Sequence, residues 1–277
     1  MTFAILIRYF LILFKYSKMN KLIFVTFLSV TWVQAFAITP EEQGLKIMQE
    51  VELRDTGFGD SRSDMKMILK NRRGDESVRI LNMRTLEIKG DGDKSLSVFS
   101  KPRDIKGTAF LSYTHALEAD EQWIYLPALK RVKRISSSNK SGPYLGSEFA
   151  FEDLTSFEVS KYSYKYLKDD VLNGIESFVV ESYPQYEFSG YTRHIVWVDK
   201  VRYIPLKTDY YDRKNSLLKT LENKEYKQYL DKYWRASEML MTNHQNGKST
   251  VLLWENYSFR NGLTDRNFDR NTLKRSR

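Results

Sequence analysis

The first strongly patterned segment of the chain predicts a short amphipathic helix that starts near Thr39. Thr39 is a favourable N-cap residue, Pro40 suits the first helical position, and Glu42 completes a capping box. Apolar residues then recur at helical spacing over Leu45–Val51, and Gly57 is the expected stop. The pattern predicts one helix of about four turns whose apolar stripe needs a surface to pack against.

The chain that follows is almost entirely strand-like. Short runs of alternating apolar and polar residues are separated by turn residues, among them Asn173-Gly174 and Asn246-Gly247. The expected strands are Ser63–Lys70, Val78–Lys89, Ser95–Ser100, Thr108–Tyr113, Gln122–Leu126, Arg131–Ser136, Glu158–Leu167, Ser177–Tyr183, Tyr191–Asp199, Ile204–Tyr211, Leu217–Tyr226, Trp234–Asn243 and Ser249–Tyr257. Consecutive strands without crossover helices predict one large antiparallel sheet, mainly β with some α.

A sheet of this size is too large to stay flat, so we expect it to curl into a barrel or half-barrel. The N-terminal helix is then the natural cover for its concave face. A wide curl would leave an apolar cavity, whereas close packing of helix against sheet would fill the interior. The pattern leaves both arrangements open.

Composition removes several functional classes. The chain has 277 residues and no cysteine, which excludes disulfides, cysteine nucleophiles, thiolate zinc sites and a lipid-modified N-terminal cysteine. His115, His194 and His244 lie far apart and form no metal-binding or Ser-His motif. No P-loop, GxSxG or dinucleotide-binding glycine motif is present. We therefore predict a protein that is not an enzyme and that uses no cofactor and no metal.

The N-terminus resembles a targeting segment. Met19-Asn20-Lys21 precedes an apolar run over Leu22–Val33, and Ala35-Phe36-Ala37 is a small-x-small cleavage signature. This predicts a secretory signal peptide cleaved after Ala37, with Met1–Lys18 as an upstream start and the true start at Met1 or Met19. A membrane anchor is the alternative, although each apolar run is shorter than the roughly 20 residues of a spanning helix.

Cleavage would separate residues 1–37, the upstream segment and signal peptide, from a single domain over 38–277. It would remove four basic residues and no acidic ones, so the formal net charge would fall from +9 to +5. This mild positive charge is typical of a solvated surface, or of one that meets anionic head groups, and we expect no nucleic-acid partner.

Three segments in the middle of the chain carry a family resemblance. They are Pro102–Leu111 (PRDIKGTAFL), Trp123–Ile135 (WIYLPALKRVKRI) and Gly146–Leu154 (GSEFAFEDL). In this order they resemble the LolA-like outer membrane lipoprotein-sorting proteins, and the resemblance covers most of the chain after residue 37, including Trp197–Lys207.

The resemblance implies a LolA/LppX-like incomplete antiparallel barrel, closed by the N-terminal helix and short helices, around a hydrophobic cavity for acyl chains. It also implies periplasmic residence and association with an inner-membrane transporter of the resistance-nodulation-division (RND) type. The chain differs from true lipoprotein carriers along much of its length, which leaves another lipid open as the ligand. The absence of cysteine agrees with a carrier and not with a lipidated acceptor.

Each motif also has a structural interpretation. Asp104–Leu111 is either a turn, in which Gly107 permits a positive φ, or a loop at the cavity mouth. Trp123 and Tyr125 share one strand face and either fill a core or touch a ligand. The stripe of Tyr162, Tyr164 and Tyr166 is either an amphipathic strand face or a stacking surface for sugars.

Four cations occupy five positions at Lys130, Arg131, Lys133 and Arg134. They form either solvated surface or a docking patch for anionic head groups or an acidic partner. Glu152-Asp153 is a poor acid–base pair, because adjacent residues point in different directions.

Alternation and the resemblance together give the candidate cavity wall. The expected ligand-binding residues are Leu45, Met48, Met65, Met67, Leu69, Phe110, Trp123, Tyr125, Phe178 and Val180. Two functions follow: a periplasmic carrier of lipid or lipoprotein acyl chains, which needs an open cavity, or a non-transporting binding or scaffold protein attached to an RND-type exporter, which needs an exposed apolar patch.

Overall fold

The computed structural model describes residues 38–275, so the predicted signal peptide and its cleavage site lie outside the described residues. Within them, one α-helix, α2 (Pro40–Asp55), precedes thirteen strands. The strands are β1 (Asp60–Lys70), β2 (Glu76–Leu86), β3 (Lys94–Lys101), β4 (Ala109–Tyr113), β5 (Glu121–Leu126), β6 (Arg131–Ile135), β7 (Tyr162–Leu172), β8 (Ile175–Pro184), β9 (Tyr191–Asp199), β10 (Pro205–Asp212), β11 (Leu217–Tyr229), β12 (Tyr233–Asn243) and β13 (Ser249–Phe259).

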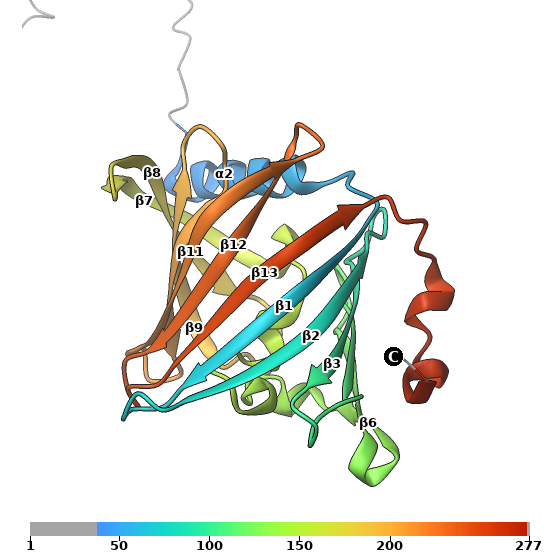
Figure 1. Cartoon of the computed structure of the whole chain (residues 1–277). Coiled ribbons are helices and arrows are strands. Elements are labelled where there is room, and N and C mark those ends of the chain that lie inside the picture. Colours follow the sequence, from blue (N-terminus) through green and yellow to red (C-terminus); the bar gives the residue numbers. More distant parts are fainter. Residues whose placement is uncertain (1–37, 276–277) are drawn as a thin grey trace, which may run out of the picture. The chain divides into compact units, whose positions relative to one another are not determined.

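All thirteen strands form one antiparallel sheet, in the order β6-β5-β4-β3-β2-β1-β13-β12-β11-β10-β9-β8-β7 (Figure 1). Each strand pairs with the strands before and after it in the sequence, except that β6 and β7 do not pair with each other and β1 pairs with β13. The sheet curls but does not close, because β6 and β7 remain its two edges. The predicted fold class, a large antiparallel sheet forming an incomplete barrel, is confirmed.

The helix α2 lies across one end of the curled sheet (Figure 1). Its N-terminus has the expected capping box, in which the Glu42 amide donates to Thr39 Oγ1 over 3.1 Å and the Thr39 amide donates to Glu42 Oε2 over 3.0 Å. Ile47 and Met48 are buried against β7, β8 and β9. Gly44 touches β7 so closely that a Cβ there would lie 2.7 Å from the Tyr166 nitrogen.

The connection between the two edge strands, residues 136–161, is called the crossing segment here. It contains four short 3₁₀ helices: η2 (Ser137–Asn139), η3 (Tyr144–Gly146), η4 (Phe151–Leu154) and η5 (Val159–Lys161). Tyr144 is buried, with its ring 5.2 Å from that of Phe110 and its hydroxyl 2.8 Å from Ser97 Oγ. The crossing segment therefore fills part of the concave face. It also shortens the strand predicted from Glu158, since η5 precedes β7.

The C-terminal residues cover the opposite, convex face of the sheet. After β13 the chain forms η6 (Asp265–Phe268) and η7 (Arg270–Arg275), and the apolar side chains of this stretch pack on β3, β4 and β5. Trp123 belongs to this convex cluster and Tyr125 packs against it. The prediction that both residues face the concave interior is therefore wrong. The two residues do share one strand face, but it is the C-terminal segment that buries it.

Candidate functional site

A cavity of about 1360 Å³ lies between the concave face of the sheet, α2 and the crossing segment. This volume exceeds the roughly 300–1,000 Å³ of ordinary small-molecule pockets. Its apolar wall comes from alternate residues of neighbouring strands, which include Met65, Met67, Leu81, Met83, Leu252 and Trp254. The structure thus has an open interior, one of the two arrangements that the sequence left undecided.

Half of the predicted ligand-binding residues line this cavity. They are Leu45, Met48, Met65, Met67 and Phe110. Phe178 and Val180 face the concave side but are covered by α2, and Leu69 packs beside the cluster around Met67 without reaching the cavity. Trp123 and Tyr125 lie on the other face.

Several lining residues did not appear in the sequence prediction. They include Val196, Leu221, Met239, Leu252 and Trp254, from β9, β11, β12 and β13. The alternation of Leu252 and Trp254 along the chain could have predicted that they share one face of their strand. The sequence did not show that these strands curl toward β1, which is what brings their inner faces into the same wall.

Part of the cavity wall is polar. Ser182 on β8, His194 on β9 and Tyr210 on β10 are directly paired across the sheet, so they form one row on the concave face. The His194 ring lies 4.8 Å from the Tyr210 ring and 5.0 Å from the Tyr191 ring. Burial lowers the pKa of His194 to about 4, so the imidazole is neutral near pH 7.

Next to this row lies a buried ion pair. Lys219, which pairs with Tyr210 across β10 and β11, contacts Asp153 of η4. Asp153 also accepts hydrogen bonds from the Tyr191 hydroxyl over 2.8 Å and from the Ala150 amide over 2.7 Å. Its neighbour Glu152 accepts instead from Gly190, Ser189 and Tyr186. The two adjacent carboxylates point to different partners, as expected, and hold the crossing segment in place.

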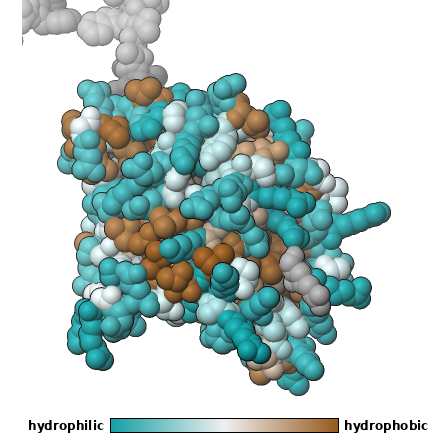
Figure 2. All heavy atoms as spheres, in the orientation of Figure 1, coloured by the Kyte–Doolittle hydropathy of each residue, from teal (hydrophilic) through white to brown (hydrophobic). Residues whose placement is uncertain are grey.

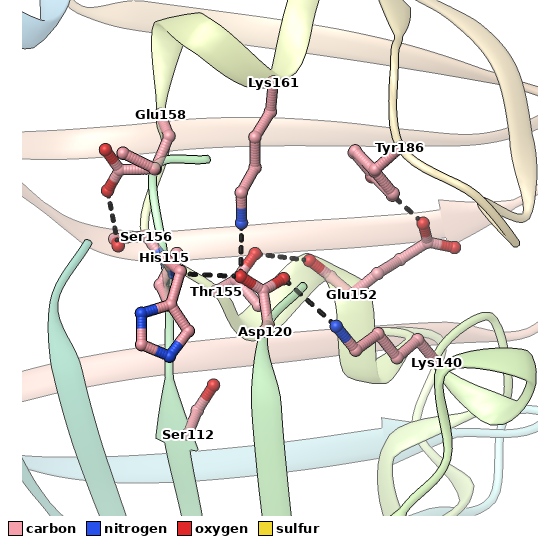
Figure 3. Close-up of polar contacts among 12 residues, drawn as sticks. Ser112, His115, Asp120, Lys140, Glu152, Thr155, Ser156, Glu158, Lys161 and Tyr186 are labelled. Carbon is pink, nitrogen blue, oxygen red and sulfur yellow. Dashed lines mark hydrogen bonds and ion pairs between the residues drawn. The ribbon is translucent and has the colours of Figure 1, made fainter. Parts of the chain in front are cut away.

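A second polar cluster fixes the crossing segment at its other side (Figure 3). The carboxylate of Asp120 contacts both Lys140 and Lys161, and all three side chains are almost fully buried. Asp120 also accepts from the His115 amide over 3.1 Å. Lys140 and Lys161 stand near the two ends of the crossing segment, so one carboxylate joins both ends to the loop before β5.

The cavity rim beneath α2 is acidic. Glu87 accepts hydrogen bonds from the amides of Gly57 and Gly59. Burial, together with the nearby charges of Glu158 and Glu87, raises the pKa of Asp93 to about 7. Burial also raises the pKa of Glu158. This rim therefore disfavours further negative charge.

The other motifs have structural roles. Gly107 has a φ of +82°, as a turn requires, and residues 104–107 do not line the cavity. Tyr162, Tyr164 and Tyr166 share the concave face beneath α2, where they pack with Val159 and Val180. Among the described residues, no group of three or more histidines or carboxylates is arranged to hold a metal ion. In the same part of the chain, no helix is long and apolar enough to cross a membrane.

Comparison with known proteins agrees with this architecture. A family model described as "Uncharacterized protein" matches residues 91–275. The chain is similar to an outer membrane lipoprotein-sorting protein domain from Vibrio parahaemolyticus, with 56% identity and a TM-score of 0.83, covering 84% of this chain and 99% of that one. The chain belongs to the outer membrane lipoprotein-sorting protein family.

Two further structures extend the comparison. A DUF1329 family protein from Desulfovibrio piger is 29% identical, with a TM-score of 0.80 over 85% of this chain and 99% of that one. A LolA superfamily protein from Nitrosomonas europaea is 18% identical, with a TM-score of 0.67 over 85% of this chain and 99% of that one. It has the same fold. A search of curated proteins gave no match.

The predicted docking cations of this lipoprotein-sorting family member are all exposed. Lys130, Arg131, Lys133 and Arg134 lie on or next to the edge strand β6, and Arg134 makes an exposed 3.0 Å contact with Glu121. The segment η7 packs along the same strand and adds three exposed cations with no acidic residue between them: Arg270, Lys274 and Arg275. The basic surface, defined as these seven residues, is therefore larger than the sequence motif.

Proposed function

We propose that this protein is a periplasmic carrier that holds the acyl chains of a lipid or lipoprotein in its cavity during outer-membrane lipid or lipoprotein sorting. The observation that carries the proposal is the cavity of about 1360 Å³ with an apolar wall, inside a fold shared with a lipoprotein-sorting domain. A periplasmic location requires the predicted signal peptide, with cleavage after Ala37.

The wall has the chemistry that flexible chains require. Each methylene moved from water into such a wall contributes about 0.8 kcal/mol, so a long acyl chain gains several kcal/mol. Five methionines line the cavity: Met48 on α2, and Met65, Met67, Met83 and Met239 on the sheet. Because thioether side chains repack easily, this wall suits ligands of variable shape.

Delivery requires a surface that meets a membrane or a partner. The basic surface on β6 and η7 supplies several exposed charges that act together on an anionic lipid surface. An RND-type transporter remains the proposed inner-membrane partner, as the family resemblance implies.

The proposal is tested by lipid retention and by blocking the cavity. Native mass spectrometry of protein purified from envelope should detect bound lipid, and a fluorescent fatty-acyl probe should bind the delipidated protein. Ala236 lines the cavity, whereas Lys66 points outward from β1. We expect Ala236→Trp to weaken probe binding at least about tenfold while Lys66→Trp does not. A wild-type protein that retains no lipid and binds no probe would overturn the carrier function.

The exporter-attached scaffold is the second candidate, and one observation favours it. Val78, Ile68, Val251 and Leu240 form a cross-strand row on the outer face of β2, β1, β13 and β12. Figure 2 shows an apolar area on this otherwise mostly hydrophilic face. Under the scaffold function, Val251→Lys would abolish partner association, and cavity-blocking variants would have no effect on envelope function.

A further inference from the structure

We propose that the row Ser182–His194–Tyr210 is a polar subsite that binds the uncharged ester, amide or hydroxyl group attached to the ligand's acyl chains. The inference rests on the proposed carrier function and specifies the head group that the cavity selects. None of the sequence motifs pointed to these residues.

The first argument is unsatisfied hydrogen bonding. His194 Nε2 is buried and has no hydrogen-bond partner, although its residue lines the cavity. Buried polar atoms almost always have a partner in a folded protein. Within the described residues, the hydroxyls of Ser182 and Tyr210 also make no hydrogen bond. Three neighbouring groups on one row therefore remain available to a polar group that enters the cavity.

The second argument concerns charge. The nearest ionised groups, Asp153 and Lys219, neutralise each other over 2.6 Å. The cavity lining as a whole holds more acidic than basic side chains; the acidic ones are Glu52, Asp55, Glu87, Asp91, Asp93, Glu152, Asp153, Glu158 and Asp231, and the basic ones are Arg54, Lys89, Arg202, Lys232 and Arg235. An anionic head group on the row would be desolvated next to Lys219, which is already paired with Asp153, and this makes its binding costly.

The third argument is placement beside the apolar wall. Val196 lies two residues from His194 on the same face of β9, and Leu221 lies two residues from Lys219 on β11. An acyl chain that packs against Val196 and Leu221 can place its ester or amide on the row. A neutral imidazole with hydroxyls on either side can both donate and accept hydrogen bonds, as an ester carbonyl or a hydroxyl requires.

Displacement of the fluorescent fatty-acyl probe by competitors of equal chain length tests the subsite. The competitors are 1-monopalmitoylglycerol, N-palmitoylethanolamide and palmitate, which carry an ester, an amide and a carboxylate. We expect the wild type to prefer the two uncharged competitors over palmitate by at least about tenfold. A preference for the ester or for the amide distinguishes a glycerolipid from an N-acylated lipoprotein as the source.

Single variants of the row should remove that preference. We expect His194→Leu, Ser182→Ala and Tyr210→Phe each to weaken binding of the uncharged competitors about three- to tenfold and to leave palmitate unchanged. Tyr257→Phe is the matched control, because Tyr257 lines the cavity away from the row. If His194→Leu does not fold, the other two variants decide.

The outcomes separate the two proposals. Displacement by all three competitors with equal affinity, or an unchanged preference in every row variant, would overturn the subsite and leave the carrier function standing. Failure of the wild type to bind the fluorescent probe at all would overturn the carrier function itself.

Discussion

Asp153 and Lys219 form an ion pair 2.6 Å long in which both side chains are only 4% exposed. Lys219 Nζ also donates to the carbonyl oxygen of Glu148 over 2.9 Å, so one ammonium group ties β11 to two positions of the crossing segment. The polar side of the cavity depends on this attachment.

Replacing Lys219 by Met should strongly destabilise the protein. The variant leaves the Asp153 carboxylate buried without its cation, and breaking a buried pair in this way costs about 3–5 kcal/mol. Urea unfolding measures the loss. Lys224→Met is the control, because its pair with Glu222 is exposed and should be worth less than about 1 kcal/mol. Equal effects of the two variants would show that burial of the inner pair does not matter.

Gly44→Ala should loosen α2, although alanine is the better helix former. The added Cβ would lie 2.7 Å from the Tyr166 nitrogen, so helix and strand must separate. We expect a loss of about 1–3 kcal/mol, comparable to overpacking in a core. Thermal unfolding and acyl-probe exchange measure the effect, with Lys46→Ala on the exposed side of α2 as the control. Increased stability of the Gly44→Ala variant would contradict the tight contact.

The pKa of Asp93, raised to about 7, predicts a specific pH dependence. The folded protein binds this proton more tightly than the unfolded chain, whose aspartate titrates near 4. The contribution of Asp93 to stability is therefore most favourable below about pH 4 and is lost as the pH rises toward 7.

Asp93→Asn should remove this loss. We expect the variant to gain roughly 1–3 kcal/mol at pH 8 and almost nothing at pH 4. Urea unfolding at the two pH values checks it, with Asp75→Asn in an exposed turn as the control. A gain in stability of the same size at both pH values would mean that it does not come from the protonation of Asp93.

The basic surface should serve docking more than folding. Exposed charges such as Arg131 and Arg134 each contribute on the order of 0–1 kcal/mol to stability, so Arg131→Glu with Arg134→Glu should barely change the Tm. Binding to vesicles with anionic lipid should weaken at least about tenfold and should be sensitive to salt. Lys214→Glu with Lys227→Glu gives the same charge change elsewhere. Lost stability with unchanged vesicle binding would assign the two arginines a structural role.

Much of the fold follows from local sequence signals. The capping box at Thr39 and the alternation in each strand predict the helix and the thirteen strands, because these signals act over a few residues. Alternation also separates the two faces of a strand correctly, as it does for Met65 and Met67. It does not say which face is concave. Trp123 was assigned to the wrong side because Leu273 and its neighbours, which bury it, carry no regular period.

The polar part of the site was beyond sequence reasoning for a different reason. Ser182, His194 and Tyr210 become neighbours only through the register of three strands, and each looks ordinary within its own strand. The partner of Asp153, Lys219, is likewise 66 residues away in the sequence. Such contacts depend on the curl of the whole sheet, which no short motif encodes.

The pairing of β1 with β13 also has a consequence for how the protein folds. Strands β1–β6 and β7–β13 are two runs of hairpins that can form from local contacts, whereas Met65 meets Trp254 only when nearly the whole described chain has been brought together. Contacts of such long sequence separation form slowly. Met65 and Trp254 are neighbours in the cavity wall. The apolar cavity is therefore complete only after β1 and β13 have paired. The cavity that we propose as the ligand site is therefore incomplete in any partly folded chain in which β1 and β13 have not yet paired.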